Sequence, residues 1–163
     1  MKIYSLYRSQ TLALSLQEAW EFFSSPYNLN TITPDFFNIT ITSKVPERIY
    51  SGLMISYSMR AIAGIPMAWL SEISHCDEPK RFVYEQRIGP FKFWSHEVCL
   101  TEQDNGIAME DIVFYAMPLG WFGSALNTLL IADRLEQIFN VRRDYLETRW
   151  GLKPAHNSLS DNS

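Results

Sequence analysis

Apolar and polar residues alternate along most of the first 117 residues, which is the spacing of β-strands. A first run covers residues 3–14, and six more cover residues 37–43, 53–61, 67–75, 81–88, 91–101 and 107–117. The segments between the later runs are short and contain turn residues such as Gly64, Pro79 and Asn105. Connections this short join antiparallel neighbours, so the pattern predicts one antiparallel sheet of about seven strands.

Two helical stretches interrupt the strands after the first run. Ser15 followed three residues later by Glu18 is the signature of a capping box, which marks the start of a helix. Trp20 and Phe23 then fall on one face of that helix. A second, shorter helical piece is predicted over residues 27–32.

The last long segment, residues 119–150, has apolar residues at helical spacing. Its stripe includes Leu129, Ala132, Leu135, Phe139 and Leu146, and Arg142 falls on the same spacing. A helix of this length would measure about 45 Å and needs an equally long apolar surface beside it. The predicted fold class is therefore α+β: a curved antiparallel sheet around a long C-terminal helix, with two short helices after the first strand.

Length, charge and hydropathy narrow the class of protein. The 163 residues fit one domain, which we place at residues 1–150, and the polar segment 151–163 is predicted to be a disordered tail. A net charge of −4 without any basic run argues against nucleic acid as a partner. No apolar stretch reaches the roughly 18 residues that span a membrane, and residues 1–10 do not read as a signal peptide. We therefore expect a cytoplasmic protein.

The sequence carries no strong catalytic or metal-binding motif. Cys76 and Cys99 are expected to be free thiols, and no His, Cys or carboxylate cluster has the spacing of metal ligands. There is no glycine-rich phosphate loop and no nucleophile elbow. We therefore expect no metal and no cofactor, and we assign no catalytic residue. This favours binding over catalysis, while the question of an enzymatic activity stays open.

Polar residues are predicted to meet on one face of the sheet. Trp94 and His96 share a face of one strand, and Asp111 and Tyr115 share a face of the next. A hairpin register with Trp94 opposite Tyr115 places Asp111 diagonal to His96. Three interpretations stay open: a buried hydrogen-bond network that braces the hairpin, a set that orients a ligand, or an acid/base pair with Tyr115 as a donor.

Aromatic residues make up 14% of the chain, enough both to fill a core and to line a pocket.

Gln86 lies on the same face of its strand as Tyr84 and is predicted to project inward, where its amide needs partners or orients a polar ligand group. Apolar segments with Gly and Pro, at residues 59–69 and 118–122, predict either core packing or a lid capable of transient membrane contact.

A string of short motifs runs through the same segments. They are Trp20 and Phe23, Arg81-Phe82-Val83 leading to Glu85-Gln86, Gly89-Pro90-Phe91, Trp94-Ser95-His96, Met109-Glu110-Asp111 with Val113 and Tyr115, Pro118-Leu119-Gly120, and the stretch from Phe139 to Arg143. Over about residues 1–150 the chain resembles the SRPBCC superfamily, also called START-like or helix-grip, which includes lipid-transfer domains, the birch-pollen allergen group and polyketide cyclases. The resemblance is to its small bacterial members, labelled ligand-binding or cyclase/dehydrase-like. Those proteins often have a second histidine where this chain has Val98, which argues against a two-histidine or metal site.

The pattern and the resemblance together predict the binding of a small hydrophobic or amphipathic ligand, such as a lipid, a polyketide-like molecule or an aromatic metabolite. The expected cavity lies between the sheet and the C-terminal helix, with Gln86, Trp94, His96, Asp111 and Tyr115 on the sheet side and Leu129, Ala132 and Phe139 on the helix side. One alternative is a cyclase or dehydratase that acts on a polyketide-like or aromatic substrate and uses His96 or Tyr115 as acid/base. Another is a structural or partner-binding protein whose own side chains fill the cavity.

Overall fold

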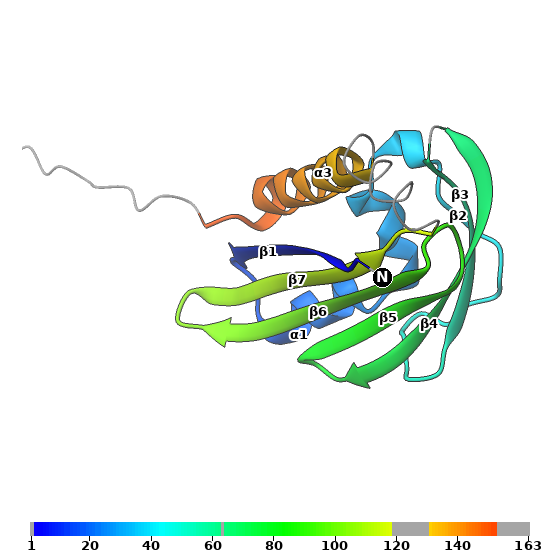
Figure 1. Ribbon diagram of the computed structural model, residues 1–163. Helices are drawn as coiled ribbons and strands as arrows, with labels where there is room; N and C mark the ends of the chain where they lie inside the picture. Colours follow the sequence, from blue (N-terminus) through cyan, green and yellow to red (C-terminus); the bar gives the residue numbers. More distant parts are fainter. Residues whose placement is uncertain (1, 63, 119–130, 153–163) are drawn as a thin grey trace, which may run out of the picture.

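The computed structural model describes residues 2–62, 64–118 and 131–152. Within them, seven antiparallel strands form one sheet in the spatial order β1-β7-β6-β5-β4-β3-β2. The strands are Tyr4–Leu12 (β1), Thr40–Ile41 (β2), Met54–Ile62 (β3), Ile65–Asp77 (β4), Arg81–Ile88 (β5), Phe93–Gln103 (β6) and Gly106–Ala116 (β7). Figure 1 shows the sheet curving around the helices, which confirms the predicted α+β helix-grip fold.

The two short helices predicted after the first strand are α1 (Leu16–Phe23) and the 3-10 helix η1 (Pro26–Ile32), and a second 3-10 turn, η2 (Asp35–Phe37), follows them. The C-terminal helix α3 is described over Ala132–Trp150. The remainder of the predicted helix, residues 119–130, lies outside the described residues.

The capping box that the sequence predicts at the start of α1 is present. The hydroxyl of Ser15 accepts a hydrogen bond from the backbone N–H of Glu18, at 3.2 Å. The carboxylate of Glu18 accepts one in return from the backbone N–H of Ser15, at 2.9 Å. These bonds satisfy backbone groups that the first turn of a helix leaves without partners. The cap fixes where α1 begins and so turns Trp20 and Phe23 toward the sheet.

One predicted strand, residues 37–43, is wrong over most of its length, because only Thr40–Ile41 pairs with β3. The residues before it form the η2 turn, which Pro34 precedes. Asn38 then adopts a left-handed conformation with φ 45°. A residue in that conformation cannot continue an extended strand, so pairing begins only after it.

The hairpin between β6 and β7 has the predicted register, with Trp94 opposite Tyr115 and His96 opposite Val113. Gly106 begins β7 with φ +140°, and a Cβ at this position would lie 2.0 Å from the backbone carbonyl oxygen of Leu12. Only glycine accommodates both conditions. The close approach allows the end of β1 to pack directly against the hairpin turn.

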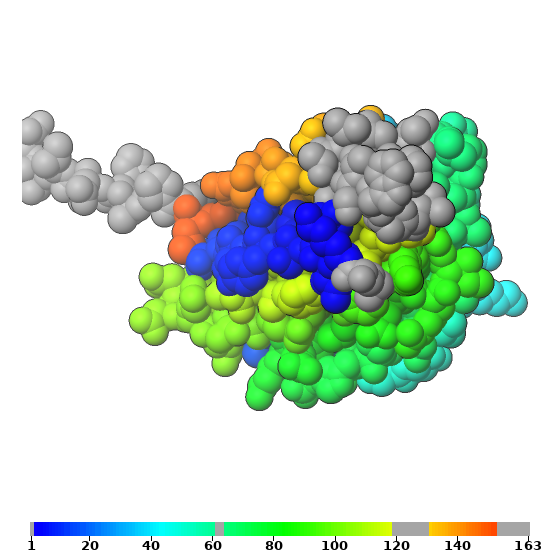
Figure 2. All heavy atoms as spheres, viewed as in Figure 1, coloured from blue at the N-terminus to red at the C-terminus, as the bar shows by residue number. Residues whose placement is uncertain are grey.

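Helix α3 is held against β1 at both ends of the described segment. Arg8 of β1 forms an ion pair with Glu136 of α3. The backbone N–H of Ala13, just after β1, donates to the carbonyl oxygen of Trp150 at 2.7 Å. Figure 2 shows α3 packed beside β1 on this face of the molecule. These contacts fix which side of the helix faces the sheet.

Buried side chains form two clusters on the inner face of the sheet. The first contains Trp69, Trp94 and Tyr115 from the sheet and Phe139 from α3. The second gathers around Trp20 of α1 and includes residues of β5, β6 and β7 and Leu146 of α3. Side chains from both clusters border a cavity between the sheet and the helices.

Candidate ligand-binding cavity

The cavity has a volume of about 180 Å³ and is lined by side chains from β3, β4, β5 and β6, with α1, η1 and α3 opposite them. Most of these side chains are apolar or aromatic. Cavities of about 150 Å³ lined by Leu, Ile and Phe stay free of water and bind benzene. The cavity therefore has the size and surface for an apolar molecule of about one ring, or for the end of a larger one.

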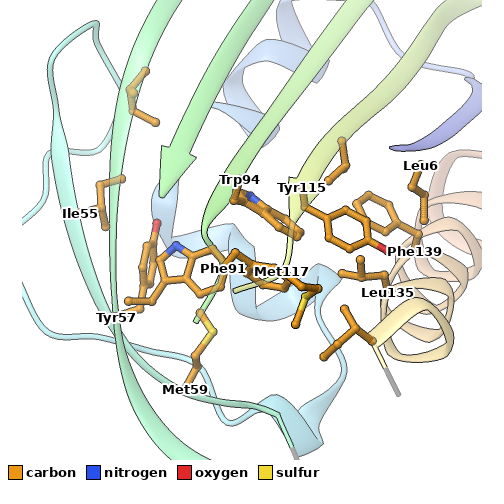
Figure 3. Close-up of a cluster of buried hydrophobic side chains, with 14 of the residues drawn as sticks. Leu6, Ile55, Tyr57, Met59, Phe91, Trp94, Tyr115, Met117, Leu135 and Phe139 are labelled. Carbon is orange, nitrogen blue, oxygen red and sulfur yellow. The ribbon is translucent and has the colours of Figure 1, made fainter. Parts of the chain in front are cut away.

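Aromatic rings build one wall of the cavity (Figure 3). The ring centroids of Trp69 and Trp94 lie 5.5 Å apart at an angle of 87°, an edge-to-face arrangement. The ring centroids of Phe91 and Trp94 lie 4.9 Å apart. On the opposite side, Phe139 of α3 contacts the His96 ring edge-to-face at 5.4 Å. This packing holds the wall in one conformation, because each ring is fixed by its neighbours.

A buried hydrogen-bond network lies at the edge of the cavity. Nε2 of His96 lies 2.8 Å from Oδ1 of Asp111, and Nη2 of Arg142 lies 3.1 Å from the same oxygen. The hydroxyl of Tyr84 is hydrogen-bonded to Nδ1 of His96. His96, Asp111 and Arg142 are each at most 6% exposed, so the network is shielded from water.

The charges in this network follow from its geometry. Burial raises the pKa of Asp111, but the charge of Arg142 and the hydrogen bond from His96 outweigh it and hold that pKa below its usual value. Burial lowers the pKa of His96, and Arg142 acts in the same direction, against the raising effect of Asp111. At neutral pH, Asp111 is therefore ionised and His96 is neutral.

An ionised carboxylate only accepts hydrogen bonds, so Nε2 of His96 carries the proton and donates it to Asp111. Nδ1 is then the acceptor, and the Tyr84 hydroxyl donates to it. Burial is the main cause that raises the pKa of Tyr84, so its hydroxyl stays protonated. The result is a directed chain from Tyr84 through His96 to Asp111, with Arg142 closing it from α3.

Arg142 is only partly satisfied by this network. Its Nε is buried and has no hydrogen-bond partner among the described residues, although the guanidinium lies 5.6 Å from the ring centre of Phe23. The indole N–H of Trp94 is likewise buried and without a partner there. Unpaired buried donors are uncommon in proteins, and each costs free energy unless a ligand or water satisfies it.

Five of the predicted site residues fall into three groups. Trp94, His96 and Phe139 border the cavity. Asp111 does not border the cavity, but it is hydrogen-bonded to His96, which does. The Gln86 amide instead binds the backbone of Phe91, donating to the carbonyl oxygen at 2.7 Å and accepting from the N–H at 3.2 Å, and so braces the turn before β6.

Two further predicted residues, Tyr115 and Ala132, lie away from the cavity. Tyr115 is buried and stacks on Tyr4 with ring centroids 5.4 Å apart, and it is not among the described residues that border the cavity. Ala132 is half-buried at the start of α3 and does not border the cavity either. Leu129 lies outside the described residues.

Among the polar residues that line the cavity and that sequence reasoning missed are Tyr57, Tyr84 and Arg142. The sequence does contain a signal for Arg142, because it occupies a position on the apolar stripe of the last helix beside Phe139 and Leu146. A charge at such a position indicates a buried partner. Tyr84 and Tyr57 have the inward parity of their strands, which apolar side chains share, so nothing in the pattern distinguishes them.

The segment 59–69, which the sequence offered as a lid, belongs to two strands. Strand β3 ends at Ile62, and strand β4 begins at Ile65. Met59 and Trp69 are buried and belong to the core. The second proposed lid segment, residues 118–122, lies outside the described residues apart from Pro118.

Among the described residues, no group of His, Cys, Asp or Glu is placed to hold a metal ion. Cys76 and Cys99 are both free and half-buried. Burial, reinforced by Glu97 and Glu110, raises the pKa of the Cys99 thiol to about 11. None of the described helices is long and apolar enough to cross a membrane.

Comparison with solved structures places the fold among known proteins. CV1439 from Chromobacterium violaceum superposes with a TM-score of 0.68 at 10% identity, over 91% of this chain and 99% of that one. Major latex-like protein 151 from Panax ginseng gives 0.65 at 14% identity, over 93% and 99%. The di-domain ARO/CYC StfQ of the steffimycin biosynthetic pathway gives 0.61 at 11% identity, over 90% of this chain and 52% of StfQ.

No protein-family model matches the sequence, and no curated protein gives a significant match to it. At these identities the structural similarities show that this chain shares its fold with those proteins. The chain has a helix-grip fold, with an apolar cavity bordered by the sheet and the C-terminal helix.

Proposed function

We propose that the protein binds a small apolar or amphipathic molecule in the cavity between the sheet and α3. The observation that carries this proposal is the cavity itself, about 180 Å³ in volume and walled by aromatic and aliphatic side chains. Burial of a ligand there would contribute roughly 25 cal/mol per Å² of apolar surface removed from water. Such sites are mostly apolar, with a few polar groups that fix the pose of the ligand.

The structural neighbours support this proposal at the level of the fold, since a latex-like protein and an aromatase/cyclase share it. Within this fold the ligand is proposed to contact Trp94, His96 and Phe139, as expected from the sequence, together with Tyr57, Tyr84 and Arg142. Asp111 would act through His96. We propose that the protein is a cytoplasmic carrier or sensor. Transient membrane contact is proposed for the apolar segment 118–122.

A cavity-filling substitution tests this proposal directly. Ile138 of α3 is half-buried and borders the cavity, whereas Val141 on the same helix is 41% exposed. We expect Ile138→Trp to abolish the binding of a neutral naphthalene-based fluorophore, measured by its emission, because the indole would occupy the space. Val141→Trp is the matched control and should bind like the wild type. Equal binding by the wild type and Ile138→Trp would contradict the proposal.

The alternative function is a cyclase- or dehydratase-type enzyme, and one observation favours it. The chain from Tyr84 through His96 to Asp111 has the form of an acid/base relay whose outer hydroxyl meets the cavity. In this arrangement the phenol oxygen of Tyr84 would accept a proton from the substrate while its own proton passes to Nδ1 of His96. Turnover of a polyketide-like or aromatic substrate, with an inflection of the pH–rate profile that His96→Gln removes, would support the enzyme over the carrier.

A further inference from the structure

The polar groups that border the cavity are mostly engaged with one another. The indole N–H of Trp69 donates to the hydroxyl of Ser71 at 2.9 Å. Tyr84 and both nitrogens of His96 are committed to the buried network. A ligand therefore finds few polar atoms available, and those few decide which functional group the cavity accepts.

The hydroxyl of Tyr57 is one of the available groups. Tyr57 borders the cavity and is only 8% exposed, and its hydroxyl makes no hydrogen bond with any described residue. Burial raises the pKa of this phenol, so its hydroxyl stays protonated. Figure 3 shows Tyr57 extending from β3 together with Ile55 and Met59. An O–H group in such a place has a strong need for an acceptor.

Two buried nitrogens of residues that line the cavity are also donors without a partner. Nε of Arg142 and Nε1 of Trp94 both belong to residues that border it, and both lack a partner among the described residues. Donors without a partner favour a ligand that brings a hydrogen-bond acceptor. A pure hydrocarbon would leave the Tyr57 hydroxyl without a bond.

The net charge of the buried residues decides whether a charged or a neutral acceptor is favoured. The positive charge of Arg142 is already paired with Asp111 at 3.1 Å, and His96 is neutral. The buried part of the site therefore has no net charge. A carboxylate placed there would be a third buried charge without a free counter-ion, which is costly in free energy, whereas a carbonyl oxygen accepts a hydrogen bond without that cost.

We propose that the cavity selects a neutral aromatic molecule with a carbonyl oxygen, and that this oxygen accepts a hydrogen bond from the hydroxyl of Tyr57. This proposal rests on the proposed binding function and names the class of ligand. The aromatic wall of Trp69, Phe91 and Trp94 would stack against the ring. The volume of the cavity suits an aryl ketone of about one ring.

Three probes of similar shape test the proposal: acetophenone, α-methylstyrene, which replaces the carbonyl by a CH₂ group, and benzoate. Their dissociation constants at pH 7 would be measured by quenching of tryptophan fluorescence. We expect acetophenone to bind about two- to twelvefold more tightly than α-methylstyrene, the ratio that one hydrogen bond supplies. Benzoate should bind most weakly.

Substitutions then assign the effect to one hydroxyl. Tyr57→Phe should remove the preference for acetophenone and leave the affinity for α-methylstyrene unchanged. The matched control is Tyr50→Phe, because Tyr50 is 56% exposed, and it should keep the preference. Since the Tyr57 hydroxyl has no bond to lose within the described residues, Tyr57→Phe should fold normally, which an unchanged urea midpoint would verify.

The outcomes separate the two proposals. Equal binding of acetophenone and α-methylstyrene, unaffected by Tyr57→Phe, would overturn the ligand class while the cavity stands as an apolar binding site. Tighter binding of benzoate, lost in Arg134→Gln, would also overturn it and would place an anion at the exposed Arg134 of α3. Failure of all three probes to bind would overturn the binding function together with the ligand class.

Discussion

At the scale of single residues, Arg142 is the charge on which the buried network depends. It reaches Asp111 from α3 and joins the helix to the β6–β7 hairpin, which the sequence separates by some 30 residues. A buried ion pair contributes little net stability compared with an apolar pair, but the loss of one partner leaves the other charge uncompensated.

We expect Asp111→Asn to lower the free energy of unfolding by about 3–5 kcal/mol, because Arg142 would keep a buried charge without a counter-ion. The double variant Asp111→Asn with Arg142→Met should lose much less than the sum of the single losses. Urea denaturation followed by tryptophan fluorescence measures all three variants. Additive losses would show that the two residues act independently, contrary to their 3.1 Å contact.

Because His96 is buried and neutral, we expect the stability of the protein to depend on pH. Its pKa in the folded protein lies below the ordinary value of 6.5, so the unfolded chain takes up protons first as the pH falls below that value. The free energy of unfolding should therefore decrease from about pH 6.5 downward. Asp111 adds a second decrease below its ordinary value of 3.8, because its folded pKa is also depressed.

Denaturant midpoints between pH 7 and pH 5 measure the histidine contribution. His96→Gln, which keeps a donor toward Asp111, should flatten the decrease in this interval. His75→Gln is the matched control, since His75 lies on an exposed part of β4, and it should keep the wild-type slope. An unchanged slope in His96→Gln would contradict the assignment of a neutral, buried His96.

At the scale of elements, α1 depends on its cap. It has only eight residues, and helices this short are marginal without capping and tertiary packing. We expect Ser15→Ala to lower the free energy of unfolding by about 1 kcal/mol, while Ser15→Asp, which retains an acceptor, should lose much less. Thermal or urea unfolding gives the measurement, with Ser5→Ala on exposed β1 as the control. An unaffected Ser15→Ala would mean that packing alone holds α1.

The strands show where pattern reasoning works and where it fails. The interval Arg81–Ile88 and the register of β6 and β7 could be predicted, because alternation and a short turn leave few other pairings. Residues 37–43 alternate equally well but form a strand only at Thr40–Ile41. The left-handed Asn38 ends the preceding turn there, and alternation carries no information about such a local backbone choice.

At the scale of the whole molecule, ligand binding and stability are linked. Any molecule that enters the cavity binds the folded state and not the unfolded chain. We expect a bound apolar ligand at 100 times its dissociation constant to raise the free energy of unfolding by about 2.7 kcal/mol. Thermal unfolding with and without ligand measures this, and the cavity-filled Ile138→Trp should show no shift. An equal shift in that variant would indicate binding elsewhere on the surface.

The sequence by itself determined the α+β class, the number of strands, the capped first helix and the diagonal placement of Asp111 beside His96. These depend on short-range patterns: alternation, capping residues and the length of a hairpin turn. Only the tertiary structure decided which polar residues share the cavity, because that depends on how α3 and distant strands pack together. It brought Arg142 to Asp111, Tyr84 to His96, Tyr57 to the aromatic wall and the Gln86 amide to the backbone of Phe91.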